Sequence, residues 1–174
     1  MIAEAHTWVT TALGLLGSPI VDPRVSTNEA DLASHWARVR PCALLLAGRQ
    51  QMTRSGSVVA RVSETGAART RRRRLFRRVL PLTVTLLAET EAVAEELMTE
   101  LLVQLGPGFN DGGGNWVRLV GVQAGWTGER SRLRTEHAAA VTLTLAGGVF
   151  RDEASVRFTD VVLTGVLRQP GAVL

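Results

Sequence analysis

The chain has 174 residues, of which 45% are apolar and 21% charged, so we expect one domain over residues 1–174 with a core of its own. All 20 basic residues are arginines, which excludes chemistry that needs a lysine, such as Schiff-base formation or a P-loop. Eight arginines and one acid lie between Arg61 and Arg78, a local net charge of +7 in a chain whose total is +4. A protein that coats DNA usually spreads its basic residues more widely.

The ends of the chain and its cysteine content limit the cellular context. Cys42 is the single cysteine, so no internal disulfide can form and a reducing compartment is acceptable. The first residues include Glu4 and no basic segment, unlike a secretory signal peptide. No apolar run approaches the roughly 18 residues of a transmembrane helix. We therefore expect no membrane partner.

The N-terminal third predicts two helices and a strand. Ser26–Glu29 has capping-box spacing and predicts a short second helix as far as Trp36. The segment CALLLAG from Cys42 predicts a short buried strand. A first helix, ended by Gly17, is predicted by a face of residues at helical spacing: Ile2, His6, Val9, Leu13 and Leu16.

A long β-hairpin is predicted from Ser57 to Leu87, with its turn at Glu64–Ala67. Strict alternation places an apolar face on the return strand: Leu80, Leu82, Val84 and Leu86. The same alternation divides the arginines between two faces, with Arg72, Arg74 and Arg78 on one and Arg69, Arg71, Arg73 and Arg77 on the other. Because both faces are charged, we expect residues 57–80 to project beyond the core. These seven arginines are the candidate interface toward a partner or a DNA channel.

The remaining elements predict an α+β fold: a mostly antiparallel β-sheet with a long projecting hairpin and with helices packed on the sheet. A helix is expected over Glu89–Leu105, and a loop, GFNDGGGN, should follow it. Strands are expected at Trp116–Val122 and Ala139–Leu145, joined by a polar connection. Residues 151–174 form a C-terminal extension in which ASVRFTDVVLTGVL could add a last strand. The helix should bury one apolar face, opposite four glutamates: Val93, Leu97, Leu101 and Leu105.

A search for catalytic chemistry finds little. His6, His35 and His137 are far apart and lack the spacing of metal ligands. Cys42 lies in an apolar segment, which favours an inert buried thiol over a nucleophile. The segment NDGGGN has some likeness to a calcium loop but lacks the later bidentate glutamate, so a glycine-rich turn is favoured. We expect no enzyme activity, no cofactor and no metal site.

Three interpretations of the arginine cluster remain open. Arginines can bind the phosphates of a nucleic acid, although Phe76 is the only aromatic residue nearby. The hairpin can instead be merely solvated. Seven arginines on one ribbon repel each other, however, so an acidic or polyanionic partner is favoured over plain solvation.

The order of elements resembles the tail terminator proteins of long-tailed bacteriophages over roughly residues 1–150. An amphipathic N-terminal helix and a basic hairpin lead into RRVLPLTVTLLAETEAVAEELMTELLVQLG, an apolar strand followed by an acidic-faced helix. GGNWVRLVGVQAGW then begins a strand with Gly-Asn and ends it with Trp126, and Val141–Phe150 closes with Gly-Gly-aromatic. The cluster from Arg69 to Arg78 is not itself a hallmark of that family.

The resemblance implies a structural virion protein with no catalytic activity. Such proteins form a ring, usually a homohexamer, that caps the tail tube, ends its polymerisation and offers a joining surface to the neck of the head. The expected partners are further copies of the chain, the tail tube protein and a neck or head-completion protein, with DNA passing through the channel. The expected location is the tail or neck of the virion, after assembly in the host cytoplasm. A head-completion protein of the same fold and an arginine-rich nucleic-acid-binding module are the alternatives.

Overall fold

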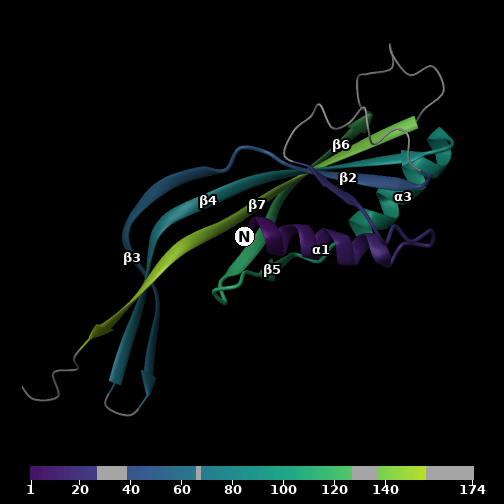
Figure 1. The fold of residues 1–174 in the computed structure, drawn as a ribbon. Coiled ribbons are helices and arrows are strands. Elements are labelled where there is room, and N and C mark those ends of the chain that lie inside the picture. Colours follow the sequence, from purple (N-terminus) through teal and green to yellow (C-terminus); the bar gives the residue numbers. More distant parts are fainter. Residues whose placement is uncertain (27–38, 66–67, 127–136, 156–174) are drawn as a thin grey trace, which may run out of the picture.

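A computed structural model describes residues 1–26, 39–65, 68–126 and 137–155 of the chain. These residues form two helices and a curled, mostly antiparallel sheet of seven strands, which confirms the α+β class (Figure 1). The second helix expected as far as Trp36 falls almost entirely on residues 27–38, outside the described residues, and Ser26 itself belongs to a strand. In chain order the elements are α1 (Ile2–Gly14), β1 (Arg24–Ser26), β2 (Cys42–Ala47), β3 (Gln51–Thr65), β4 (Ala68–Ala88), α3 (Glu91–Gln104), β5 (Gly108–Asn110), β6 (Trp116–Trp126) and β7 (His137–Ser155).

Two long strands, β4 and β7, run through the whole sheet and pair with each other from Arg69↔Ser155 to Ala88↔His137. At one end, β2 borders β4 while β6 borders β7, and β1 and β5 lie outside them. At the other end, β3 pairs with β4 from Gln51↔Val79 to Thr65↔Ala68. The sheet is therefore wide around the core and narrows to three strands, β3, β4 and β7 (Figure 1).

The core lies at the wide end of the sheet. Leu80, Leu82, Val84 and Leu86 are fully buried, as their alternation predicts, and they share one apolar cluster with residues of α1 and α3. The predicted buried faces of the helices are largely confirmed: the buried members are Val9, Leu13, Leu16, Leu97, Leu101 and Leu105. The prediction fails at the first turn of each helix, where Ile2 is 41% exposed and Val93 37% exposed. Ala5 and Ala12 in α1 and Ala94 in α3 are buried beside the predicted residues.

Helix α3 begins two residues later than predicted because Thr90 caps it. The Thr90 hydroxyl accepts a hydrogen bond from the backbone N–H of Val93 at 3.3 Å, which satisfies one of the free donors of the first turn. The predicted loop after this helix is also partly wrong. Its first residues form β5, which pairs with β6 through Phe109↔Val117.

Strand β7 is much longer than predicted. It continues past Gly147 and Gly148 to Ser155, so the first five residues of the expected C-terminal extension belong to the sheet. Both positions hold glycine because neighbouring atoms leave little room for a side chain on either face of the strand. A Cβ at Gly147 would lie 3.2 Å from Met1 Sδ, and one at Gly148 would lie 2.7 Å from the Phe150 ring. Residues 156–174, with most of the possible last strand, are outside the described residues.

Within the described residues, no helix is long and apolar enough to cross a membrane.

Candidate functional site

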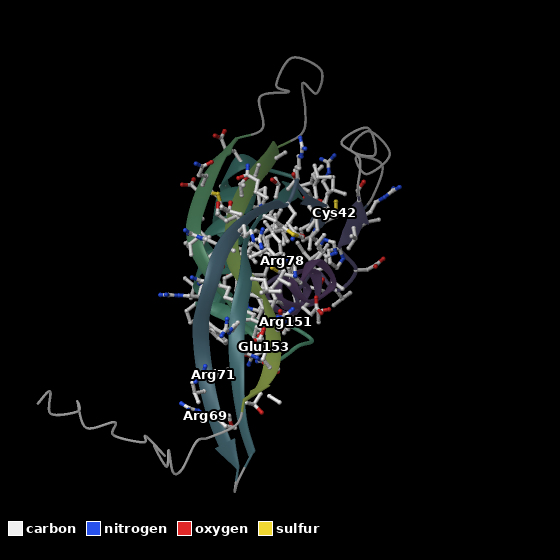
Figure 2. All side chains as sticks on the ribbon, turned by 90° about the vertical axis from the view of Figure 1, so that its left-hand side faces the viewer. Cys42, Arg69, Arg71, Arg78, Arg151 and Glu153 are labelled. Carbon is white, nitrogen blue, oxygen red and sulfur yellow. The ribbon has the colours of Figure 1, made fainter. Side chains whose placement is uncertain are left out.

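The three-stranded end of the sheet carries the arginine cluster, and we call it the basic ribbon: residues 51–65 of β3, 68–79 of β4 and 147–155 of β7. Ten arginines and three carboxylates lie in these segments, a net charge of +7, which leaves −3 for the rest of the chain. The ribbon curves away from the helices (Figure 1). Its labelled arginines follow one another from Arg78 near the core to Arg69 toward the far end (Figure 2).

A β-bulge at Leu75 changes which face each arginine occupies. Phe76 pairs with Val149 and Arg74 pairs with Phe150, so Leu75 is an extra residue on β4. Because side chains alternate along a strand, one extra residue exchanges the faces beyond it. The predicted faces are therefore wrong on the far side of the bulge. Directly paired residues point to the same side, which puts Arg72, Arg74 and Arg77 on one face and Arg69, Arg71, Arg73 and Arg78 on the other.

The two glycines of β7 confirm this division. A Cβ on Gly147, the partner of Arg78, would contact Met1 and Val117 on the core side of the sheet. A Cβ on Gly148 would instead lie 3.2 Å from Cδ of Arg74, on the opposite side. Arg74 and Arg78 therefore point in opposite directions, although strict alternation would put them together.

On the Arg72 face, Asp152 of β7 is the main acidic partner. Arg72 Nε donates to Asp152 Oδ1 at 2.8 Å and Nη2 donates to Oδ2 at 3.0 Å, a bidentate ion pair. The guanidinium carbon also lies 6.0 Å from the centre of the Phe150 ring. The hydrogen bond from Arg72 lowers the pKa of Asp152 and raises that of Arg72 itself.

On the opposite face, Glu153 interacts with several arginines at once. Arg151 Nε donates to Glu153 Oε1 at 3.0 Å, and this hydrogen bond is the largest cause of the lowered pKa of Glu153. Arg73 Nε lies 3.0 Å from Glu153 Oε2, yet this N–H makes no aligned hydrogen bond, so the contact is an ion pair only. The nearby charge of Arg71 lowers the pKa of Glu153 further.

These contacts offset part of the mutual repulsion that the sequence predicts among the seven arginines. Arg72 and Arg73 pair with Asp152 and Glu153, two acids that the sequence interpretation had placed in a separate C-terminal extension. Arg74 and Arg77 make no ion pair with any residue that the structure describes, and Arg77 is exposed. The ribbon therefore keeps positive charge available for a partner on the Arg74–Arg77 face.

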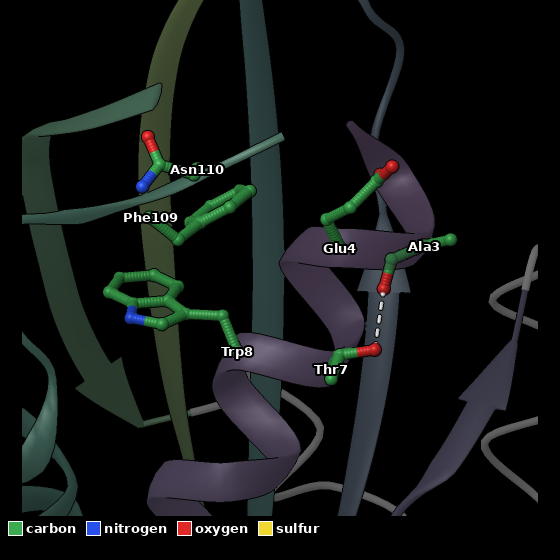
Figure 3. A pocket seen from close by; sticks show the side chains of 6 residues that line it. All are labelled: Ala3, Glu4, Thr7, Trp8, Phe109 and Asn110. Atoms are coloured by element: carbon green, nitrogen blue, oxygen red, sulfur yellow. Dashed lines mark hydrogen bonds between the residues drawn. The ribbon is translucent and has the colours of Figure 1, made fainter. Parts of the chain in front are cut away.

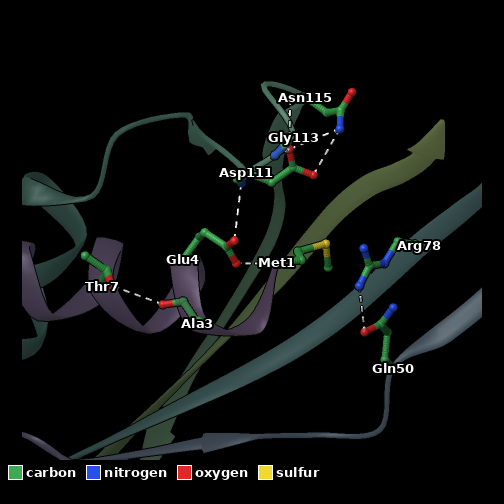
Figure 4. Close-up of polar contacts among 10 residues, drawn as sticks. Met1, Ala3, Glu4, Thr7, Gln50, Arg78, Asp111, Gly113 and Asn115 are labelled. Carbon is green, nitrogen blue, oxygen red and sulfur yellow. Dashed lines mark hydrogen bonds and ion pairs between the residues drawn. The ribbon is translucent and has the colours of Figure 1, made fainter. Parts of the chain in front are cut away.

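A glycine-rich turn connects the ribbon to the rest of the molecule. Asp111 Oδ1 accepts hydrogen bonds from the backbone N–H groups of Gly113 at 3.0 Å and Asn115 at 2.8 Å (Figure 4). Asn115 Nδ2 donates to the same carboxylate, and Asn115 Oδ1 accepts from Arg72 Nη1 at 3.2 Å. Because Asp111 is used within its own turn, these contacts favour a structural turn over a calcium loop. No cluster of potential metal ligands occurs among the described residues.

A shallow pocket of about 420 Å³ lies between α1 and β5 (Figure 3). Trp8 and Phe109 line it, and the centroids of their rings are 5.3 Å apart. The Glu4 carboxylate at the pocket forms an ion pair with the N-terminal ammonium and accepts a hydrogen bond from the backbone N–H of Gly112 at 3.2 Å (Figure 4). These contacts lower the pKa of Glu4 to about 2, and the hydrogen bond from the ammonium is the largest cause. The pocket therefore presents an aromatic surface rather than a free acid.

The remaining sequence candidates do not assemble into a site. Cys42 carries a thiol that is in no disulfide; it is 5% exposed and packed with Leu87 and Ala138. His6 is half-buried on α1, where burial lowers its pKa, whereas His137 begins β7 and pairs with Ala88. His35 lies outside the described residues.

Comparison with known proteins adds no relative. No known family has a sequence model that matches this chain, and a search of curated proteins found no match either. The likeness to tail terminators therefore stays a prediction from the order of the elements.

Proposed function

We propose that the chain is a structural protein of a long-tailed phage particle, a tail terminator that caps the tail tube and ends its polymerisation. The observation that carries the proposal is the basic ribbon, which holds +7 while the rest of the chain holds −3. Copies of a subunit with two such unlike regions can join through different patches, as a closed ring requires. Opposite charges on the two patches would steer and orient the contact.

In this proposal the two ends of the sheet have separate tasks. The wide end, where α1 and α3 contribute to the apolar cluster, would form the wall of the ring. The β3–β4 hairpin, supported by β7, would be the projecting element that reaches a neighbour. The proposed partners are further copies of the chain, the tail tube protein and a neck protein, in a particle assembled in the host cytoplasm. DNA would pass through the ring.

The test is tube growth in vitro. Tail tubes polymerised with an excess of the protein should become shorter and carry a ring at one end in electron micrographs. The variant Arg74→Glu/Arg77→Glu should shorten tubes less, while Arg118→Glu, an exposed arginine outside the ribbon, should act like the wild type. Unchanged tube length with the wild-type protein would contradict the proposed function.

Two other functions are tested alongside. A neck or head-completion protein would leave tube length unchanged but would bind heads that have been filled with DNA. A nucleic-acid-binding module is favoured by one observation, the exposed Arg77 beside Arg74 with no acid of the described chain paired to either. It predicts that wild-type protein binds duplex DNA at physiological salt and that Arg74→Glu/Arg77→Glu abolishes this binding.

A further inference from the structure

We propose that the basic ribbon of one copy docks on the acidic outer face of α3 in the next copy. The proposal rests on the proposed function, since both require the chain to assemble with itself, and it names the two surfaces that meet. The partner of the ribbon is thus a second copy of this chain, bound through a different part of its surface.

The acidic surface follows from a strong separation of charge along the chain. Residues 79–117 contain six acids and no arginine, directly after the cluster that ends at Arg78. Helix α3 buries its apolar face, so its acids lie on the outside, and Glu95 and Glu96 are exposed. Val103, on the same outer side, is 76% exposed, which adds apolar area for a partner to cover.

Glu100 does not belong to this free surface. Its carboxylate accepts a hydrogen bond from the backbone N–H of Gly17 at 2.9 Å and so links α3 to the end of α1. The docking face is therefore centred on Glu95 and Glu96, in the first half of the helix, and not on the acid nearer its end.

The two surfaces cannot meet within one copy. Helix α3 packs at the wide end of the sheet, whereas the ribbon extends from the opposite end (Figure 1). The strands between them are continuous β4 and β7, which cannot fold back without breaking their pairing. A ribbon-to-ribbon contact between two copies would bring like charges together. A head-to-tail contact is the arrangement that pairs the opposite charges.

A second copy fits the ribbon better than a nucleic acid does. Asp152 and Glu153 lie on the ribbon itself, one on each face, and interrupt its positive charge, whereas a nucleic acid presents phosphates continuously along its backbone. Two carboxylates on one turn of a helix need only the positive charge of Arg74 and Arg77, and Asp152 can stay paired with Arg72. The contact would be salt-dependent because both surfaces are exposed.

The experiment uses charge reversal on each surface. Arg74→Glu/Arg77→Glu reverses two charges of the ribbon, and Glu95→Arg/Glu96→Arg reverses two charges of α3. Arg118→Glu is the control for a reversed charge elsewhere on the surface. Sedimentation velocity at low salt should show self-association of the wild type and of the control, reversed by added NaCl. Each double variant alone should self-associate at least about tenfold more weakly, because its like charges would face each other.

Mixing the two variants supplies the decisive result. In an equimolar mixture, the unaltered ribbon of one variant meets the unaltered α3 of the other, and the two reversed surfaces also complement each other. The mixture should therefore associate, and so should a chain that carries all four substitutions. Circular dichroism of each variant checks its folding. A wild type that stays monomeric at low salt, or a mixture that stays monomeric, overturns the proposal.

The outcome separates this contact from the proposed function. Association through these surfaces with unchanged tube length would leave the contact standing and remove tube capping. Shortened tubes without any rescue in the mixture would keep the capping function and remove this contact. Loss of DNA binding by the ribbon variant, with self-association intact, would assign the ribbon to nucleic acid instead.

Discussion

The wide end of the sheet and the basic ribbon share the same two strands but are held together in different ways. At the wide end, Leu82 and Leu143 are paired across β4 and β7, and both are fully buried in the apolar cluster. Along the ribbon, the same strands carry arginines that are half-buried or exposed, and neither α1 nor α3 covers them. Apolar burial stabilises the first region, whereas the second depends on its backbone pairing, two ion-pair groups and a link through Asn115.

Two long strands can thus carry charged side chains beyond the core of a domain without a second domain to support them. Pairing between β4 and β7 continues from the core into the ribbon, so the part of the strands in the core fixes the direction of the ribbon. Arg74 and Arg77, which form no ion pair with any described residue, are then available to a partner without loss of a contact that holds the ribbon. The two regions should accordingly respond very differently to substitution.

The largest effect is expected from the core. Leu82→Ala should lower the free energy of unfolding by about 2–5 kcal/mol, because Leu82 is fully buried and a cavity would remain. Urea denaturation followed by circular dichroism measures this loss. Thr53→Ala, at an exposed position of the ribbon, is the control and should cause almost no change. Equal losses in both variants would contradict the contrast between the two regions.

A smaller effect is expected at the turn that links them. Asp111→Ala removes the acceptor for two backbone N–H groups and for the Asn115 side chain, so stability should fall by about 1–2 kcal/mol. With Asn115 released, its hydrogen bond with Arg72 should weaken, and amide exchange in residues 147–155 should become faster. Asp111→Asn keeps an acceptor oxygen and should show less of both effects. Unchanged exchange in these residues would mean that the turn does not support the ribbon.

Much of the wide end was predictable from the sequence, because its residue pattern and its environment agree. The alternation from Leu80 to Leu86 gave a strand with one buried face, and the spacing in residues 91–104 gave a helix. Most residues of the predicted helix faces are buried, but Ile2 and Val93 are exposed, since apolar spacing alone does not tell where the buried face begins. Thr90 was a signal that could have placed the start of α3, as threonine is a preferred N-cap residue.

The ribbon was predictable only in outline. Its seven arginines were identified, but strict alternation could not anticipate the bulge at Leu75, which exchanges their faces. The acids that pair with Arg72 and Arg73 were missed because the strand was predicted to end at Leu145, before Asp152 and Glu153. Contact with Met1 and Val117, which explains a glycine at position 147, depends on tertiary packing and is invisible in the local sequence.

A modest pH effect is expected at the ribbon, besides the one at the contact of Glu4 with the N-terminal ammonium. The pKa values of Asp152 and Glu153 are lowered from their ordinary values of 3.8 and 4.5, chiefly by hydrogen bonds from Arg72 and Arg151. Groups with lowered pKa values stabilise the fold fully above those ordinary values, and this stabilisation is lost as the pH falls through the folded-state values. NMR signals of residues 69–74 should therefore shift on acidification below pH ~4, and Asp152→Asn should remove part of the shift. Shifts spread evenly over the molecule would contradict this assignment.

The smallest effect on stability is expected from Arg74 and Arg77, which form no ion pair with any described residue. Arg74→Ser/Arg77→Ser should leave the melting temperature nearly unaltered, because neither guanidinium has an acidic partner among the described residues. Arg72→Ser/Arg73→Ser removes the same charge from the same strand and is the matched comparison. It strips Asp152 of its bidentate partner and Glu153 of one cation, so its melting temperature should fall slightly but measurably, and less so at high salt. For assembly the order should reverse, since Arg74 and Arg77 face the proposed partner while Arg72 and Arg73 already bind Asp152 and Glu153. Equal melting temperatures and equal losses of assembly in both variants would contradict this. The arginines would then act only through their summed charge, whether or not they have an acidic partner in the chain.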